Sequence, residues 1–326
     1  MNIFIPFNSE GVGGPTTFVD RFTKKLKEHN FGVSRKFSRD FDVIFVVVSC
    51  PLVYLLYAKW KKKKIIQRLD GVYHKATPAK GLYFFYNIKM RIIHNYFADV
   101  VVYQSEFSRM SCRKFLGGPR KDWVIIQNGI DVGDAPIMEK NNKDVIKLVT
   151  YAMFRRRDQI EPIIKAVEKL DKNFFFLDIY GLCTDNVKKI ILESEEAGNI
   201  RYCGEYSNGD LQSIISNYDI FLFSDQSACP NSVIEAMAAG IPVVAYNRGS
   251  VLEMVESGFN GEIVEVKDGS DPFVDAYPFR EKEYSEYADR VRRVTSDINR
   301  YSRSAYAVVK EKFDIKEIMQ KYENIL

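Results

Sequence analysis

The sequence predicts an α/β protein with two domains, each built around a doubly wound parallel sheet. Runs of Val, Ile and Phe alternate with segments of helical periodicity along the chain, the pattern of successive β-α-β units. The 326 residues also amount to about two domains of typical length. A polar, aperiodic stretch at 132–144 separates two such runs. We therefore expect domains at 1–137 and 144–310. A C-terminal helix at 311–326 is also expected to pack back on the first domain.

The two halves repeat the same order of predicted elements. The helix after the first strand has Pro15 near its first turn and places Phe18, Phe22 and Leu26 four residues apart. Helices are also expected between the later strands and over 281–326. Strands are predicted at 2–6, 43–48, 65–68, 100–103 and 124–127 in the first half, and at 146–152, 174–180, 200–203, 219–223, 242–245 and 262–264 in the second.

One apolar stretch, residues 43–58, resembles a membrane span in composition. Its roughly 16 residues fall short of the roughly 20 that a spanning helix needs, and Pro51 interrupts it. We expect a buried strand over 43–48 and a helix over 52–60 instead. Residues 1–8 lack the basic region and cleavage site of a signal peptide. The expected location is cytoplasmic, with a peripheral position at the inner face of a membrane as one option.

Composition narrows the classes of partner. Residues 1–140 carry 23 Lys and Arg against 12 Asp and Glu, whereas residues 141–326 carry 24 against 31. The basic half is expected to meet a phosphorylated substrate or an anionic membrane; nucleic acid is disfavoured because no groove-reading motif occurs. Five scattered cysteines and three histidines predict neither a disulfide framework nor a metal centre. We expect no metal and no other cofactor.

A glycine-rich turn, with Gly13 and Gly14, follows the first predicted strand and precedes a helix. Backbone N–H groups at such a turn, together with the helix N-terminus, attract anions. The spacing is not G-x-G-x-x-G, which disfavours a nicotinamide dehydrogenase. We predict that the turn contacts a phosphate or the substrate; the alternative is a tight turn that requires a positive φ.

Three consecutive arginines, Arg155, Arg156 and Arg157, follow the strand predicted at 146–152. Ligands of doubly wound sheets bind at the carboxyl ends of the strands, where guanidinium groups can neutralise a diphosphate without a metal. At least one of the three is predicted to bind phosphate. The alternative is a solvated turn.

The most informative segment is 224–244, SDQSACPNSVIEAMAAGIPVV. It predicts a loop after a strand, a two-turn helix from about Ser232, and a stop at Gly240 before the next strand. Ser232 and Glu235 have the spacing of a capping box. The other interpretation is that the helix N-terminus faces a diphosphate while Glu235 accepts hydrogen bonds from ribose hydroxyls.

These residues resemble a known family. The segment 201–264 is similar to the carboxyl-terminal domain of GT-B-fold glycosyltransferases of the family 4 type, above all in the string PNSVIEAMAAGIPVV; the sequence QNGID at 127–131 and the Gly13-Gly14 turn extend the resemblance to the first half. The resemblance implies a GT-B fold, with two Rossmann-like domains facing a cleft. It also implies transfer of a hexose-type sugar from a nucleotide-diphosphate donor to a glycan, lipid-linked or other acceptor, without metal and with retention of configuration.

Carried over to this sequence, the resemblance implies donor-binding residues. Glu235 would hold the donor ribose. Backbone groups of Ser232 and Val233 would meet the diphosphate, Asn231 would also bind the donor, and one or more of Arg155, Arg156 and Arg157 would replace the family's Arg and Lys on the diphosphate. Gly13 and Gly14 would line the donor side of the cleft.

The sequence departs from the family pattern at two places. Members often show Glu-x7-Glu, but eight residues before Glu235 stands Ser227, and nearby Asp225 is out of register by two. Asp70 stands where members often have a histidine, directly before Gly71. Asp70, Asp225 and Ser227 are therefore the candidate catalytic residues, with a turn aspartate as the other interpretation of Asp70.

Two other functions stay open, the first because Ser227 replaces an acid and the second because it can share the same architecture. A non-catalytic, glycosyltransferase-like partner subunit would bind nucleotide without turnover, and a nucleotide-sugar 2-epimerase would convert the donor without an acceptor. Lysines around Trp60 and an aromatic run at 83–86 would suit an anionic membrane surface. The alternative is that these aromatics are buried and that the lysines form a solvated face.

Overall fold

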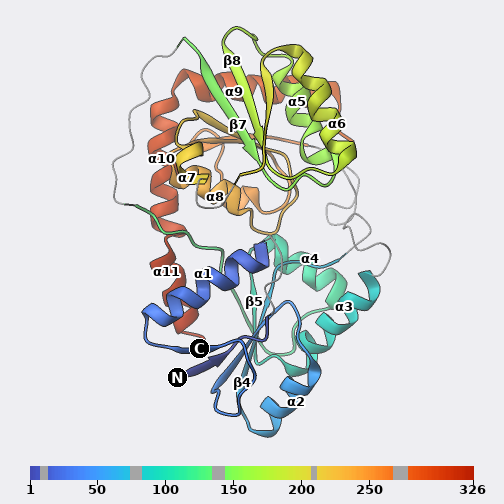
Figure 1. Ribbon diagram of the computed structural model, residues 1–326, viewed down its shortest axis with the longest axis vertical. Helices are drawn as coiled ribbons and strands as arrows, with labels where there is room; N and C mark the ends of the chain where they lie inside the picture. Colours follow the sequence, from blue (N-terminus) through green and yellow to red (C-terminus); the bar gives the residue numbers. More distant parts are fainter. Residues whose placement is uncertain (8–13, 74–82, 134–143, 207–210, 267–277) are drawn as a thin grey trace. The chain divides into compact units, whose positions relative to one another are not determined.

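A computed structural model of the chain describes residues 1–7, 14–73, 83–133, 144–206, 211–266 and 278–326 (Figure 1). The described residues form two compact units. Unit 1 is drawn from Met1–Gly129 and Ile315–Leu326, and unit 2 from Ile130–Pro272 and Ala276–Asp314. Most of the predicted linker at 132–144 lies outside the described residues. The last helix of the chain is thus part of the unit formed by the first residues.

Unit 1 is a parallel sheet of six strands in the order β2-β1-β3-β4-β5-β6. The order reverses between β1 and β3, so the turn with Gly13 and Gly14 follows a strand at the switch point. The strands are β1 (Asn2–Phe4), β2 (Gly32–Ser34), β3 (Val43–Val47), β4 (Lys64–Leu69), β5 (Val100–Tyr103) and β6 (Asp122–Ile125).

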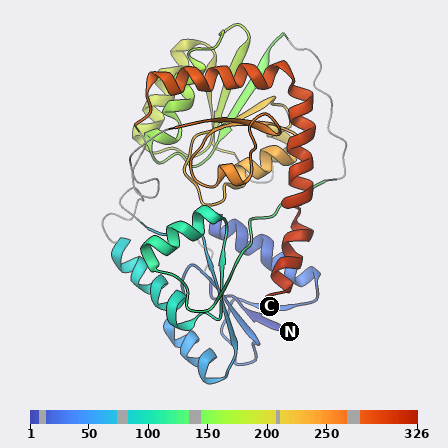
Figure 2. The same cartoon turned by 180° about the vertical axis from the view of Figure 1, so that it is seen from behind.

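Helices cover both faces of this sheet (Figures 1 and 2). On one face, Phe22 and Leu26 of α1 (Gly14–Glu28) pack with Ile318 and Tyr322 of α11 (Ile315–Glu323). Successive side chains of a strand point to opposite faces of the sheet, so every second strand residue faces the other layer of helices. That layer consists of α2 (Leu52–Trp60), α3 (Tyr83–Ile92), the π-helical turn η1 (Ile93–Phe97) and α4 (Glu106–Leu116).

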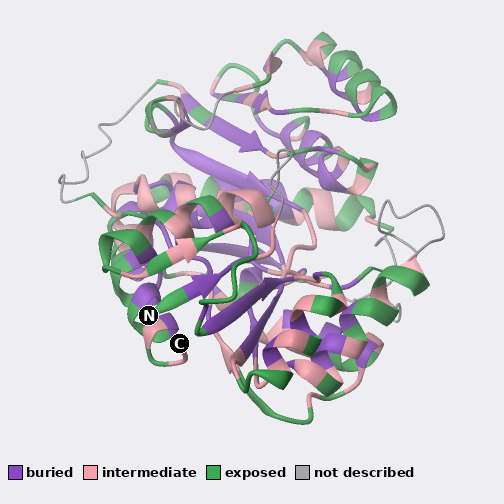
Figure 3. Ribbon diagram, turned by 60° about the horizontal axis from the view of Figure 1, so that its bottom comes forward, coloured by how far each residue is buried: buried purple, intermediate pink, exposed green. Residues whose placement is uncertain are grey.

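Unit 2 is a second six-stranded parallel sheet, in the order β12-β11-β10-β7-β8-β9. This is the Rossmann order, with the switch point between β7 and β10. In Figure 3 the strands are mostly buried, whereas the helices alternate between buried and exposed residues. The strands are β7 (Ile146–Tyr151), β8 (Phe175–Tyr180), β9 (Ile200–Gly204), β10 (Ile220–Phe223), β11 (Val243–Tyr246) and β12 (Gly261–Val264).

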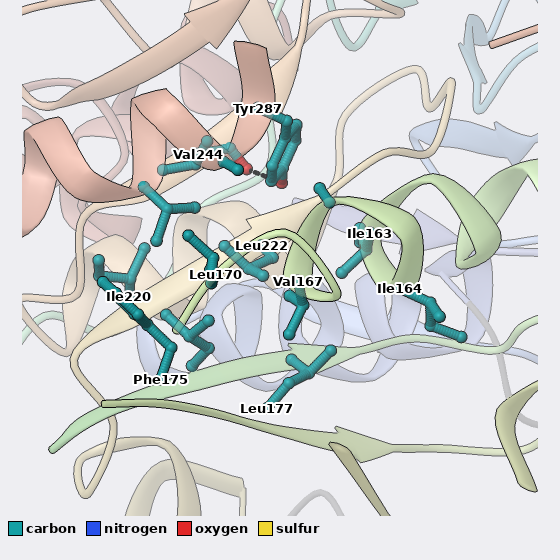
Figure 4. Close-up of a cluster of buried hydrophobic side chains, with 14 of the residues drawn as sticks. Ile163, Ile164, Val167, Leu170, Phe175, Leu177, Ile220, Leu222, Val244 and Tyr287 are labelled. Carbon is teal, nitrogen blue, oxygen red and sulfur yellow. Dashed lines mark hydrogen bonds between the residues drawn. The ribbon is translucent and has the colours of Figure 1, made fainter. Parts of the chain in front are cut away.

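The core of unit 2 has two layers of helices, one on each face of the sheet. One layer contains α5 (Glu161–Val167), α6 (Asp185–Ser194) and α9 (Glu281–Ser296), with Ile163, Leu177 and Leu222 in the cluster of Figure 4. Tyr287 of α9 is fully buried there and donates its hydroxyl to the carbonyl of Val244. The other layer contains α7 (Leu211–Ile215), α8 (Asn231–Ala238) and α10 (Ile298–Lys312). Short 3-10 turns complete the unit: η2 (Arg157–Gln159), η3 (Glu195–Ala197) and η4 (Val251–Glu253).

Each predicted strand is present, with ends that differ by at most a few residues. The stretch at 43–58 forms the buried β3 and then α2, as predicted. Within the described ranges, no helix combines the length and apolarity needed to cross a membrane. The three-residue β2 was missed, because its sequence, Gly-Val-Ser, has no apolar run.

Two of the alternative interpretations are wrong. α8 begins at Asn231 with Pro230 in the N-cap position, so Ser232 is not the N-cap and does not form the predicted capping box with Glu235. The aromatic residues Trp60, Phe84 and Phe85 are exposed rather than buried in the core. The space between the sheet and these helices is filled instead by aliphatic side chains on the inward sides of the same helices.

Candidate functional site in unit 2

The switch point of unit 2 brings two of the predicted segments together. β7 and β10 are neighbours in register, with Leu148 opposite Ile220. The arginine segment follows the carboxyl end of β7, and the loop with Asp225 follows the carboxyl end of β10. Such an edge is where doubly wound sheets bind their ligands.

A buried ring and several hydrogen bonds hold the backbone of the arginine segment in place. Phe154 is buried, and its N–H donates to the carbonyl of Leu182 at 2.8 Å. The side-chain oxygen of Gln159 accepts from the backbone N–H of Arg155 at 2.7 Å and of Arg156 at 3.0 Å. These contacts fix the backbone at the position from which the arginine side chains leave it.

The three arginines have different surroundings. Arg156 is partly buried; its Nε lies 2.9 Å from Asp158 Oδ1, and its Nη2 lies 3.1 Å from Asp225 Oδ1. Arg157 is exposed and pairs with Glu161 one helical turn later, at 2.7 Å. Arg155 is exposed. Of the three arginines, Arg156 is the one with a described side-chain contact from the β7 loop to the β10 loop, where the hydroxyl of Ser224 also donates to the carbonyl of Gln159 at 2.6 Å.

A fourth arginine, Arg248, completes this group and was missed from the sequence. It follows β11, is 7 % exposed, and donates to Gln226 Oε1 at 3.0 Å. Its Nη1 lies 3.4 Å from Asp158 Oδ2, so Asp158 lies between two guanidinium groups. The signal was available: like the triplet, Arg248 stands directly beyond the carboxyl end of a predicted strand.

The electrostatics of this group depend on burial and pairing. Burial opposes ionisation of Asp158, but the guanidinium groups of Arg156 and Arg248 outweigh it and hold the pKa of Asp158 below its usual value. Burial lowers the pKa of Arg248, and Asp158 opposes that shift. For Arg156 the carboxylates of Asp158 and Asp225 outweigh burial and raise its pKa. The site thus holds two arginines and two acids side by side.

Ser227 lies in a loop that is pinned by the Arg248 segment. Its carbonyl oxygen accepts from the N–H of Ser250 at 3.0 Å. Gly249 has a φ of +65°, and a Cβ built on it would lie 2.5 Å from that same carbonyl oxygen. A glycine is therefore needed for the two loops to approach each other this closely.

α8 supplies the other predicted residues. The carbonyl of Ser232 accepts from Tyr151 Oη at 2.8 Å, and Val233 is buried, so only its backbone can contact a ligand. The first N–H groups of a helix have no acceptor within the helix. Burial raises the pKa of Tyr206 to about 12 and that of Tyr151 well above its usual value. The negative charge of Glu235 is the second cause of both shifts. Glu235, in the first turns of α8, thus acts electrostatically on the side chains of Tyr151 and Tyr206.

The remaining predicted residues belong to unit 1. Gly13 lies outside the described residues. Gly14 is exposed at the start of α1, and no described atom beyond its own neighbours lies within 4 Å of a Cβ built on it.

Asp70 contacts Arg68, an arginine that is only 1 % exposed, and it also accepts from Gln104. Arg68 lies 3.5 Å over the ring of Phe18 and donates to Asn128 Oδ1 at 2.6 Å. Asp70 is thus the counter-ion of a buried arginine, which its turn position before Gly71 did not reveal.

No three His, Cys, Asp or Glu side chains of the described ranges gather into a group suited to a metal ion. Metal independence stays a prediction. In unit 2 the structure brings together Arg156 and Asp225, with Ser227 two residues farther along, and places Ser232 and Glu235 on one short helix. Arg155 and Arg157 are exposed, and Arg157 pairs with Glu161.

Sequence comparisons place the similarity mainly in unit 2. Residues 135–293 match the family model of glycosyl transferases group 1. A curated relative, an uncharacterized 41.2 kDa protein in the cps region of Klebsiella pneumoniae, is 24 % identical over 129 residues, which are 39 % of this chain. The match spans 35 % of that relative's own length.

Solved structures extend the similarity in fold to both units. HepE of Anabaena in complex with UDP has a TM-score of 0.75 at 15 % identity, covering 99 % of this chain and 98 % of HepE. The HepE complex with UDP-glucose has a TM-score of 0.73 at 16 % identity over 100 % and 99 % of the two chains. Sucrose-phosphate synthase from Thermosynechococcus elongatus gives 0.75 at 13 % identity over 99 % and 98 %. The predicted GT-B fold, with a Rossmann-like sheet in each unit, is confirmed.

Proposed function

We propose that this chain is a glycosyltransferase of the family 4 type, which transfers a hexose-type sugar from a nucleotide-diphosphate donor to a glycan or lipid-linked acceptor. The observation that carries the proposal is the contact of Arg156 with Asp225 across the switch point of unit 2, inside the region that matches the family model. The proposed donor is a UDP-sugar, because the similar HepE structures hold UDP and UDP-glucose.

Arg156 and the N-terminus of α8 are assigned to the donor diphosphate. Negative charge grows on this leaving group as the sugar–phosphate bond breaks, and fixed cations and N–H groups stabilise it most effectively when they are held in place beforehand. Asp158 and Asp225 hold Arg156 in this way. Arg155 and Arg157, which are more exposed, are assigned weaker contacts.

Glu235 is assigned to the ribose hydroxyls, as an acceptor of hydrogen bonds. Asp225 and Ser227 are assigned to the transferred sugar, in the region where family members often have a glutamate. Asp70 is assigned to the acceptor side in unit 1, where Arg68 orients its carboxylate. We further propose retention of configuration, independence of metal, and a cytoplasmic location.

A thermal-shift series with UDP, GDP, ADP, dTDP and their sugars tests the donor site. Binding to the native state alone raises the unfolding free energy by about 2.7 kcal/mol at a ligand concentration of 100 Kd. We expect UDP and a UDP-sugar to raise the melting temperature, and Glu235→Ala to weaken that shift. The absence of a shift with each of these nucleotides would contradict the proposal.

Turnover of the stabilising donor separates the alternatives. A transferase releases UDP faster when an acceptor is present, a 2-epimerase produces the epimeric UDP-sugar without acceptor, and a non-catalytic partner subunit binds without any turnover. NMR spectra of the reaction mixture distinguish these three outcomes, and the anomeric signals of the product report retention or inversion.

A further inference from the structure

Helix α2 of unit 1 is apolar on its outward side as well as its inward side. Leu55 and Ala58 pack on the sheet. Val53, Leu56 and Trp60 follow at helical spacing on the other side and are 63 %, 59 % and 72 % exposed. A helix that is apolar all round is normally buried all round. The outward side of α2 therefore suits an apolar environment that unit 1 does not provide.

The neighbouring helix α3 repeats this arrangement. Met90 is buried against the sheet, while Phe84 and Phe85 are 62 % and 68 % exposed. α2 and α3 belong to one layer, because Ile93, in the turn that continues α3, packs in the same cluster as Leu55 of α2. Figures 1 and 2 show the two helices next to each other on that face of the sheet.

Positive charge surrounds these apolar side chains. Residues 52–121 contain fifteen Lys and Arg but only three Asp and Glu. Lys61 lies 3.9 Å from the ring centroid of Trp60, and Arg120 lies 4.6 Å from that of the exposed Tyr96. Lys89 is exposed on α3 beside the phenylalanines.

We propose that this layer docks on an anionic lipid membrane. The docking surface, called here the aromatic–basic surface, consists of Val53, Leu56, Trp60, Phe84, Phe85, Ile88, Lys61, Lys89 and Arg91. Aromatic and aliphatic side chains enter the boundary between headgroups and acyl chains, while lysines and arginines remain at the anionic headgroups. The net charge of the layer complements an anionic bilayer, whereas a purely apolar protein partner would not require it.

The unpaired apolar residues of unit 2 offer a contrast. They come from different strands, helices and turns along the unit: Met153, Phe176, Leu182, Leu192, Leu252 and Phe259. Scattered apolar residues of this kind are normal on a protein surface, whereas a contiguous patch marks an interaction site. The membrane contact is therefore assigned to unit 1 alone.

Co-sedimentation of the full chain with vesicles tests the proposal. Vesicles of phosphatidylcholine alone are compared with vesicles that also contain phosphatidylglycerol. We expect binding only to the anionic vesicles, and weaker binding at high salt because exposed charges are screened. The absence of any preference for the anionic vesicles would overturn the proposal.

Variants locate the surface. Each basic side chain near an anionic bilayer contributes roughly a fivefold factor in partitioning, so K61E/K89E should reduce binding at least tenfold. F84S/F85S should abolish most of the remaining affinity. The matched controls in unit 2, K172E/K189E and L192S/L252S, change the same charge and the same kind of exposed residue and should bind like the wild type. Equal losses in patch and control variants would overturn the assignment to unit 1.

Two control measurements test for unfolding of the variants and for dimer formation. Melting temperatures of all variants are measured without lipid, since exposed residues should be replaceable without unfolding. Sedimentation velocity without vesicles tests whether a second copy covers the aromatic–basic surface; a dimer that F84S/F85S dissociates, combined with no vesicle binding, would overturn the proposal. The assay contains no sugar nucleotide, so its result is independent of the test of glycosyl transfer.

Discussion

The two units share one architecture and differ in where they place their charged and aromatic side chains. Each has six parallel strands with helices on both faces. Unit 2 gathers arginines and aspartates at its switch point, and Arg248 there is almost fully buried. Unit 1 instead exposes aromatics on one layer of helices and buries Arg68 with its counter-ion Asp70. A shared architecture of parallel sheet and covering helices thus leaves open which chemistry each unit carries, because function resides in the side chains at the edges of the sheet.

The largest expected effect concerns Arg156, which is paired with two acids at the switch point of unit 2. Arg156→Ala removes the guanidinium assigned to the leaving diphosphate. We expect kcat for donor turnover to fall by about 10²–10³, the cost typical of losing one preorganised stabilising group. Steady-state release of UDP measures it.

Two further variants sharpen this result. Arg157 already pairs with Glu161 in the exposed part of the segment, so Arg157→Ala should cost much less than Arg156→Ala. Lys165→Ala, which removes an exposed lysine paired with Glu168 on α5, should leave kcat unchanged. Equal effects of Arg156→Ala and Lys165→Ala would refute the assigned role of Arg156.

An intermediate effect concerns the contact that holds the Ser227 loop. Gly249 and Gly198 both have positive φ, at +65° and +81°, but only Gly249 has backbone atoms where a Cβ would be. Gly198→Ala should cost about 1–2 kcal/mol of unfolding free energy from the backbone conformation alone. Gly249→Ala should cost about 1–3 kcal/mol more from overpacking against Ser227. Urea unfolding of the two variants gives the difference, and equal losses would mean that the loops yield without cost.

The sequence predicted the strands and the segment 224–244 well, because buried parallel strands appear as continuous apolar runs and because Gly240 and Pro242 end α8 sharply. It did not reveal which arginine meets Asp225, since neighbours in sequence such as Arg156 and Arg157 leave the backbone in different directions. Arg248 also follows a predicted strand, but a single arginine stands out less in the sequence than the triplet at 155–157, and it was missed.

The exposure of Phe84 and Phe85 shows a different limit. A run of aromatic residues at the start of a helix is compatible with a core or with a surface, and only the packing of the opposite side decides between them. In unit 1 the aliphatic Met90 and Ile93 already fill the space above the sheet. The two phenylalanines therefore stay on the surface, where we assign them to the proposed contact with a membrane.

The smallest expected effect is the pH dependence of the free energy of unfolding, which should differ between the two units. His94 of unit 1 is fully buried, with Nδ1 2.6 Å from Asn95 Oδ1 and Nε2 2.6 Å from the hydroxyl of Tyr103. Burial lowers its pKa below the usual value of 6.5, while the hydrogen bond with Asn95 opposes the shift. The folded state therefore binds the proton less readily than the unfolded state, and the stabilisation is complete above pH 6.5 and is lost as pH falls from 6.5 through the folded pKa.

For Asp158 of unit 2 the pKa is also lowered, so its contribution is present above the usual value of 3.8 and is lost only at lower pH. Unit 1 should consequently lose stability first on acidification, by at most about 1.4 kcal/mol per pH unit for one proton. Urea unfolding between pH 7 and pH 5 measures the slope. His94→Gln, which cannot take up the proton, should flatten this slope. A slope that His94→Gln does not change would mean that another group titrates in this range.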